Sequence, residues 1–342
     1  MSKVKGRVGK PVIILVFCIS FLIIFLFSSW LGTVEIPLRV VLWSILGKSD
    51  ENLANTLIHE VRIPRFFMAF FSGACLAVSG QVMQILLRNP LADPYTMGIA
   101  NGAGLGVNLA MMGFLPGFLH QIYFIPVWGF AGALGASFLV LALTGGKKRR
   151  SSAEILLIGI AVSILLASIN TLLTYWAARQ TEVRHLLFWA FGNLDKSDMA
   201  SIRVAFGFAF PALLFLGLAK SQWNVLLLGE EKVSAMGFRT GRLKNGLLII
   251  SSVLTASVVC FVGPIGFVGL VVPYWARKLL PITRTGFWRL TFCMGGLFIA
   301  LCDLLSRVLF SPFGLPIGLV SSLVGVPFFL YLLRDSSRRI SF

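Results

Sequence analysis

Long apolar runs alternate with short polar segments along the whole chain. Each run is about as long as a helix that crosses a bilayer, so the pattern predicts about ten membrane-spanning helices. Glycine and proline interrupt the eighth run, which makes it the least regular. The expected spans are 11–31, 64–86, 95–115, 122–144, 154–178, 203–219, 245–263, 265–280, 287–307 and 316–333.

The composition supports an all-α integral membrane protein. Of the 342 residues, 57% are hydrophobic and only 13% are charged, which is too little polar surface for a soluble chain of this length. Many apolar runs follow the first one, so we expect it to be a signal anchor and not a cleaved signal peptide. Residues 1–342 are expected to form a single polytopic transmembrane permease domain.

The net charge of +17 follows the expected topology. With the N-terminus inside, most of the basic residues fall in cytoplasmic segments, for example at Arg88, in 147–150 and in 220–244. The positive-inside rule therefore predicts that both termini are cytoplasmic. This placement argues against a nucleic-acid-binding surface.

Motifs for catalysis, metal binding and nucleotide binding are missing from the sequence. The five cysteines lie in apolar runs without a CxxC pair, and the three histidines are scattered, so no metal-site spacing is present. There is no GxxxxGK[ST], nucleophile elbow or HExxH. We therefore expect a chain that is not an enzyme and binds no cofactor of its own.

The segment from Arg88 to Pro94 is a short polar break between two apolar runs. Pro90 and Pro94 are incompatible with a helix interior, so they are expected to end one helix and start the next. Asp93 is a candidate N-cap with Pro94 at the first helical position. The sequence predicts a tight hairpin at this point.

The largest inner loop, about 220–244, contains a candidate short amphipathic helix at Glu230–Met236. Acidic residues in its first turn suit the helix dipole, and Gly237 is a plausible C′ residue. Such a helix on the membrane surface could transmit force from a cytoplasmic partner. The alternative is an ordinary solvated linker.

Two further features lie within apolar runs. Gly263 to Pro273 is broken by glycine and proline, which a membrane protein tolerates only where other groups satisfy the freed backbone; the alternative is a kinked span. Asp303 precedes Arg307 by four residues, which predicts a local ion pair, with a proton relay as the alternative. Ser151 and Glu154 match a capping box.

Five separated segments together resemble one family. They are Arg62-Ile-Pro-Arg65, Gly73–Gly80, Asn89–Pro94, Gly229–Gly237 and Gly263–Pro273. In this order they resemble the iron-siderophore and cobalamin permease family of bacterial ABC importers, the FecCD type. Leu315–Gly318 and Gly325–Pro327 fit as well, so the resemblance covers essentially the whole chain. Tyr274 stands where the family usually has histidine.

The resemblance implies a type II importer permease of ten helices that forms a dimer in the bacterial cell membrane. It also implies a cytoplasmic ABC ATPase dimer that binds ATP, an extracytoplasmic substrate-binding protein, and a second permease that is either a copy or a paralogue. The coupling segment would comprise Gly229, Glu230, Glu231, Ala235, Met236 and Gly237. The binding protein would dock on Arg62, Arg65 and Arg307 through guanidinium–carboxylate pairs. For Arg62 and Arg65, snorkelling to lipid phosphate is the alternative.

The translocation path is expected to be lined by weakly polar groups, with few fixed charges to hold a bulky chelate. By resemblance, Asn89 and Leu91 belong to the cytoplasmic gate, and Ser152 is a further candidate. The other expected path residues are Gln81, Gln84, Asn101, Asn108, Asn170 and Thr174. The predicted function is ATP-driven import, with a ferric siderophore as the first cargo and cobalamin or haem as alternatives. A secondary transporter coupled to ions is a separate hypothesis, and a membrane-embedded lipid enzyme is disfavoured because it lacks a catalytic constellation.

Overall fold

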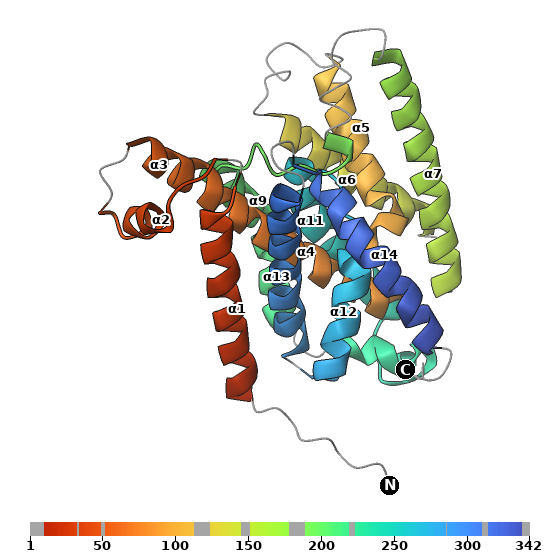
Figure 1. Ribbon diagram of the computed structural model, residues 1–342. Helices are drawn as coiled ribbons and strands as arrows, with labels where there is room; N and C mark the ends of the chain where they lie inside the picture. The colour runs from red at the N-terminus through yellow and green to blue at the C-terminus, as the bar shows by residue number, and fades with distance from the viewer. Residues whose placement is uncertain are drawn as a thin grey trace.

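Helix α4 (Ile63–Leu87) runs through the centre of the molecule, and the other long helices pack around it (Figure 1). From Phe71 to Leu87 every side chain of α4 is buried, as expected for a helix that is apolar on all sides. Its main neighbours are α11 (Thr240–Val262), α12 (Val268–Leu279) and α13 (Phe287–Val308). The computed structural model describes residues 10–32, 34–48, 52–112, 124–144, 151–177, 189–218, 223–284, 286–309 and 314–336.

The remaining helices lie outside this centre. At one edge are α1 (Lys10–Trp30), α2 (Leu38–Ile45), α3 (Asn52–Thr56) and the π-helical turn η1 (Leu57–Arg62). On the other side are η2 (Pro94–Met97), α5 (Ile99–Met111), α6 (Ile125–Thr144) and α7 (Ser152–Ala177). Helix α9 (Met199–Leu218) packs against α11. The chain also contains η5 (Asn224–Leu228), α10 (Glu230–Ala235) and α14 (Ile317–Ser336).

Each of the predicted spans contains one α-helix of the structure. Among the described residues, 6 helices are long and apolar enough to cross a membrane. The apolar parts of α1 and α14, Ile14–Trp30 and Ile317–Leu330, are shorter, and α5 and α12 have only 13 and 12 residues. The all-helical prediction is confirmed, and the number of complete crossings stays a prediction.

One predicted boundary was wrong. The expected third span begins at 95, but residues 94–97 form a 3₁₀ turn and α5 begins at Ile99, after Gly98 with a left-handed φ of 74°. The segment 33–63, which lies between the first two predicted spans, contains α2, α3 and η1, and η1 continues directly into α4. Local propensity did not predict the π-helical turn that joins these helices.

Helices α4 and α13 approach each other closely because glycine faces glycine. A Cβ added to Gly73 would lie 2.1 Å from the carbonyl oxygen of Gly295, and one added to Gly295 would lie 2.3 Å from that of Gly73. Small residues at such crossings allow the backbones of membrane helices to touch. This contact fixes the spacing of two helices that carry charged side chains at one end of the bundle.

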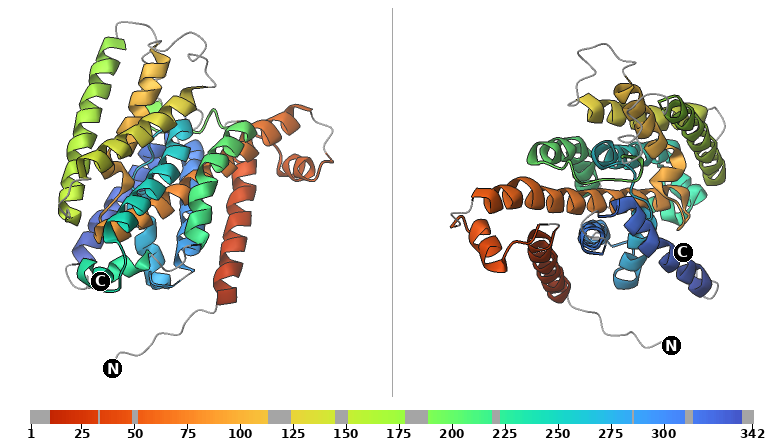
Figure 2. Two further views of the ribbon diagram at one scale, coloured as in Figure 1. Left: turned by 180° about the vertical axis from the view of Figure 1, so that it is seen from behind. Right: turned by 45° about the horizontal axis from the view of Figure 1, so that its top comes forward.

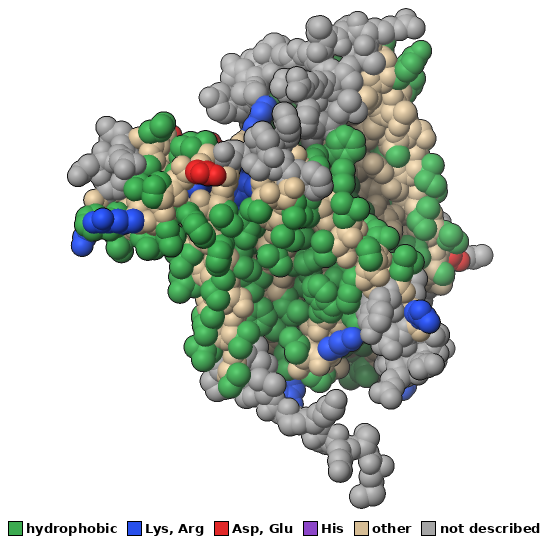
Figure 3. Space-filling model, in the orientation of Figure 1, with side chains coloured by type: hydrophobic (Ala, Val, Ile, Leu, Met, Phe, Trp, Pro, Cys, Tyr) green, Lys and Arg blue, Asp and Glu red, His purple; other side chains and the backbone are tan. Residues whose placement is uncertain are grey.

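The outer surface is apolar along the length of the bundle. Side chains of α7 and α14, including Leu157, Leu172 and Leu323, are largely exposed. Figure 3 shows hydrophobic side chains over the flank, with basic side chains gathered towards the ends. This distribution is typical of a helical membrane protein.

Candidate functional site

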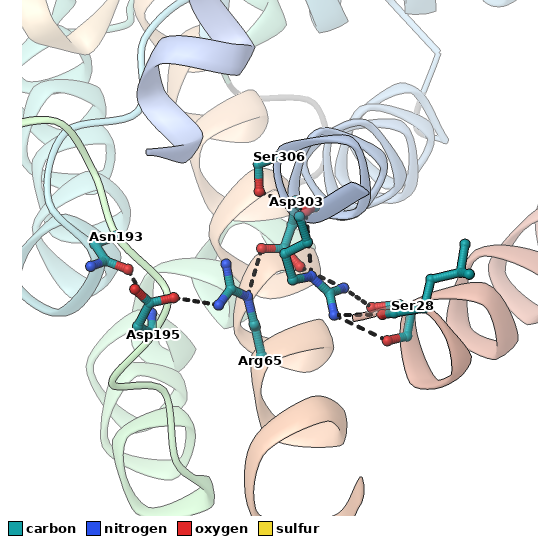
Figure 4. Close-up of polar contacts among 8 residues, drawn as sticks. Ser28, Arg65, Asn193, Asp195, Asp303 and Ser306 are labelled. Carbon is teal, nitrogen blue, oxygen red and sulfur yellow. Dashed lines mark hydrogen bonds and ion pairs between the residues drawn. The ribbon is translucent and has the colours of Figure 1, made fainter. Parts of the chain in front are cut away.

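Arg65 joins two acidic residues at one end of the bundle (Figure 4). Its Nε lies 2.8 Å from Oδ1 of Asp303, and its Nη1 contacts Oδ1 of Asp195. Asp303 is 1% exposed, whereas the Asp195 side chain is 63% exposed. Arg65 therefore connects a deeply buried carboxylate on α13 to a carboxylate at the surface.

The predicted local pair on α13 is confirmed. Arg307 Nη2 lies 3.0 Å from Oδ2 of Asp303, one helical turn earlier. Asp303 thus faces two arginines, one from its own helix and one from α4. A carboxylate that is removed from water requires such partners, so the two arginines account for the burial of Asp303.

Arg62 and Arg307 also bind the C-terminal end of α1. The last carbonyl groups of a helix have no partner within the helix, and cations are favourable there. Arg62 is 6% exposed and Arg307 is 7% exposed. Their backbone acceptors are the carbonyl oxygens of Ser28, Ser29, Trp30, Leu31 and Val34.

The predicted docking arginines are therefore brought together, but in different environments. All three line one cavity of about 290 Å³, together with Asp195 and Leu315. Their guanidinium groups are held by acceptors of the chain itself, so both the docking role and the snorkelling alternative stay predictions. Arg65 differs from the other two because one of its acceptors, Asp195, is exposed.

At the opposite end, the hairpin between α4 and α5 has the predicted turn chemistry. Asp93 caps η2: its Oδ1 accepts a hydrogen bond of 2.8 Å from the backbone N–H of Tyr95. Asn89 Oδ1 accepts one of 2.9 Å from the N–H of Leu91, an Asx turn. Arg88 ends α4 in the left-handed region with φ 49°. Leu91 is exposed and Asn89 is half-buried.

Asp93 is a buried carboxyl group with one unpartnered oxygen. It is 5% exposed, and Oδ2 has no hydrogen-bond partner. Burial raises the pKa of Asp93 to about 6, although the hydrogen bond from Tyr95 opposes this shift. The hairpin therefore contains a carboxyl group whose charge changes near neutral pH.

Helix α10 ends as the sequence predicts. Gly237 has φ 82°, its N–H binds the carbonyl of Ser234, and Phe238 N–H binds that of Val233. These two bonds form a Schellman motif. Val233 is fully buried, whereas Met236 is 57% exposed, so α10 packs by one side and presents another.

The coupling residues predicted around α10 are only partly described. Gly229 precedes the helix with φ 100°, and Ala235 is exposed. The side chains of Glu230 and Glu231 lie outside the described residues. Arg88 lies beside Gly229, because a Cβ added there would be 3.7 Å from its Nη1, so the hairpin and α10 are neighbours.

The broken run after α11 is held by other parts of the chain. Gly263 has φ 71°, and a Cβ there would lie 2.1 Å from the carbonyl oxygen of Trp189. Ile265 N–H donates to Tyr95 Oη at 2.9 Å, and Asn193 N–H to the Val262 carbonyl at 2.8 Å. The freed backbone is thus satisfied within the protein, as predicted.

Two of the predicted path residues, Gln84 and Asn101, form hydrogen bonds between helices of this chain. Gln84 is 1% exposed; its Nε2 donates to the Gly269 carbonyl at 3.0 Å, and its Oε1 accepts from Arg277. Asn101 on α5 donates hydrogen bonds to the carbonyl and the hydroxyl of Ser163 on α7. Their part in translocation stays a prediction, as it does for Gln81, Ser152, Asn108, Asn170 and Thr174.

Two other sequence features have defined places. Ser151 and Glu154 form the predicted capping box. The N–H of Ser151 donates to Glu154 Oε2 at 3.1 Å, and the N–H of Glu154 donates to Ser151 Oγ at 3.2 Å. Tyr274, at the position of the family histidine, packs edge-on against Phe328 of α14 with ring centroids 6.4 Å apart.

Sequence reasoning missed Asp195 as a partner of Arg65. The two residues are 130 positions apart, and Asp195 belongs to no local motif. Its N–H binds the Asn193 side chain at 2.7 Å, and this turn after Gly192 holds it beside α4. Among the described residues, no group of three or more histidine, cysteine or acidic side chains could hold a metal ion.

Known proteins share this architecture. A solved structure of an inward-facing transporter, described as metal-chelate type ABC, covers 95% of this chain and 99% of its own with a TM-score of 0.82 and 25% identity. The hemin transport system permease protein HmuU of Yersinia pestis is 34% identical over 98% of this chain and 99% of its own length. The cobalamin import system permease protein BtuC of Halobacterium salinarum is 35% identical over 84% of this chain and 75% of its own.

These observations define an integral membrane transport permease, with a charged cluster at one end of an apolar helical bundle and a short capped helix at the other. The chain belongs to the FecCD transport family, whose model matches residues 20–335. It is thus a permease of the iron-siderophore and cobalamin class of ABC importers.

Proposed function

We propose that this chain is the transmembrane subunit of an ATP-driven importer that receives a ferric siderophore from an extracytoplasmic binding protein. It would work as a dimer in the bacterial plasma membrane, with ten spans per chain and both termini in the cytoplasm. ATP would be bound and hydrolysed by a separate pair of ATPase subunits.

The observation that carries this proposal is that the Arg65 cluster and α10 lie at opposite ends of the bundle. The Arg65 cluster lies where α1 ends and α4 begins, and α10 lies beside the hairpin where α4 ends. Because α4 is buried along most of its length, a shift at one end is transmitted to the other as a rigid element. This suits a two-state permease whose equilibrium is biased from both sides.

A chelate of iron is the proposed cargo because of the relatives and of the expected path. Relatives named for Fe(3+)-hydroxamate import in Bacillus subtilis and for Fe(3+) dicitrate transport in Escherichia coli match over 97% and 90% of this chain. Those named for hemin and cobalamin make these two compounds the alternatives. All are bulky chelates, which a weakly polar path would release readily.

The proposal is tested first by affinity purification of the tagged chain in mild detergent. A co-purifying ATPase is expected, and it should be lost when residues 230–237 are scrambled or when the exposed Met236 is changed to Asp. Glu60→Gln, an exposed change on η1, is the matched control and should retain the ATPase. A chain that purifies without ATPase activity under every gentle condition would contradict the proposal.

Uptake of radioactive iron by cells that express the complete importer tests the energy source and the cargo. Import should stop on ATP depletion and persist with a protonophore while ATP is maintained. The opposite pattern would favour an ion-coupled secondary transporter. Competition by unlabelled siderophore, but not by cobalamin or hemin, would identify the cargo class.

A further inference from the structure

Helix α2 has apolar side chains on one side that no other element covers within the described part of the chain. Helices α2 and α3 and the turn η1 together form what we call the side arm. On α2, Val41 and Ser44 are the buried residues, and they face the inside of this arm. The outward stripe consists of Leu38, Leu42, Trp43 and Leu46, which are 44%, 39%, 46% and 68% exposed. At about 100° per residue, the stripe covers an arc of about 140°, and the exposed Arg39 lies within this arc beside Trp43. A helix with one side buried in protein and an exposed apolar stripe on the other needs an apolar partner for that stripe.

The position of the arm indicates what that partner is. Figures 1 and 2 show the side arm projecting sideways from the end of α1, at the periphery of the bundle. Trp30, the last residue of α1, packs against the apolar cluster of the arm, and Arg62 binds the carbonyls of Ser29 and Trp30. The arm is therefore fixed at the level where α1 ends.

Helix α1 defines the depth of that level. It has 21 residues, and its apolar part is Ile14–Trp30. At about 1.5 Å per residue this part is about 25 Å long, which is most of the hydrocarbon core of a bilayer. Its surface is apolar and exposed at Val16, Ile19, Leu22 and Ile23. In Figure 3 hydrophobic side chains continue from the arm onto the flank of the bundle, so the arm and the flank share one apolar surface.

The polar residues of α2 suit a bilayer interface. Arg39 lies over the ring of Trp43, 5.4 Å from its centroid, and Lys48 follows the helix. Helix α2 contains no acidic residue. Tryptophan with basic neighbours is typical of the headgroup level, where the ring and the aliphatic stems face the acyl chains and the charges face phosphate.

We propose that α2 is an interfacial helix whose outward stripe lies in the headgroup–acyl boundary of the leaflet where α1 ends. The lipid surface would then support the side arm and, through η1, the position of Arg62. The inference depends on the chain being a membrane protein, and it is independent of the cargo and of the direction of transport.

Quenching of tryptophan fluorescence tests this inference in nanodiscs that contain brominated phosphatidylcholine. The purified chain, with any subunits that co-purify, is compared with its Trp43→Phe variant. The variant should lose a component that is quenched by bromolipid and shielded from aqueous iodide. Trp223→Phe removes a tryptophan that is buried in the protein and should leave this component unchanged.

A labelled cysteine gives an independent measurement if Trp43→Phe does not fold. Leu42→Cys and the control Glu60→Cys, both on the side arm, are made in a background without native cysteines and labelled with an environment-sensitive fluorophore. Only the probe at position 42 should be quenched by bromolipid. Equal iodide quenching at both positions would overturn the proposal, as would shielding of position 42 only after a binding protein is added.

Discussion

Arg65 on α4 and Asp303 on α13 form a buried ion pair in which Arg65 Nε lies 2.8 Å from Oδ1 of Asp303. The pair joins the ends of two helices whose backbones touch at Gly73 and Gly295. Since Arg307 contacts the other oxygen of Asp303, this carboxylate lies between two positive charges. It holds together a cluster that would otherwise repel itself.

Asp303→Asn should therefore destabilise the protein strongly. The change leaves Arg307 buried without a counter-charge and Arg65 with only the exposed Asp195, and removing one partner of a buried pair costs about 3–5 kcal/mol. Reversible unfolding in mixed micelles should show a loss of this size. Glu60→Gln, which removes an exposed carboxylate, should have little effect, and equal losses for both variants would contradict the role of the buried pair.

Asp195→Asn should free Arg65 for a carboxylate from the binding protein. The exposed pair is worth about 0.2–1 kcal/mol, so we expect the affinity of the reconstituted importer for its binding protein to rise about 1.5- to 5-fold. Asp198→Asn is the matched control, because Asp198 is an exposed carboxylate of the same segment. Its Oδ1 accepts a hydrogen bond of 2.7 Å from the N–H of Ser201. If the wild type binds and neither variant changes the affinity, Asp195 does not compete for Arg65.

Asp93 should make the stability of the protein depend on pH. Burial raises its pKa to about 6 from about 3.9 in an unfolded chain, so the folded state binds the proton more tightly. The contribution of Asp93 to stability should be highest below about pH 4, fall as the pH rises to about 6, and then level off.

Asp93→Asn should remove this pH dependence, because the amide keeps an oxygen for the N–H of Tyr95 and carries no charge. Above about pH 6 the variant should be more stable than the wild type by roughly 1–3 kcal/mol. Unfolding midpoints from about pH 4 to about pH 7 measure the difference. An unchanged pH profile would show that Asp93 does not titrate in this range; Glu154→Gln controls for the removal of an exposed carboxylate.

Gly73→Ala should destabilise the contact between α4 and α13. The new methyl group would meet the backbone oxygen of Gly295 at 2.1 Å, and overpacking of this kind costs about 1–3 kcal/mol. Gly246→Ala on α11 is the control because nothing lies within 4 Å of its added Cβ; it should be neutral or stabilising by up to about 1 kcal/mol. Thermal unfolding of both variants in the same detergent decides the matter, and equal midpoints would contradict close packing.

The sequence by itself determined the features that depend on neighbours along the chain. Hydrophobic runs predicted the position of each long helix, and turn chemistry predicted the caps at Asp93, Ser151 and Gly237. The pair of Asp303 and Arg307 followed from a spacing of four residues. These features are encoded locally because helix hydrogen bonds and caps connect residues a few positions apart.

Only the tertiary structure decided which distant groups meet. Arg65 and Asp303 are 238 positions apart, and Arg62 reaches back to the end of α1, so no local pattern could reveal either contact. The sequence likewise gave no sign that α2 would project from the bundle with an apolar stripe outward. Burial and charge pairing are settled by the packing of whole helices, in which each side chain must find its partner across the fold.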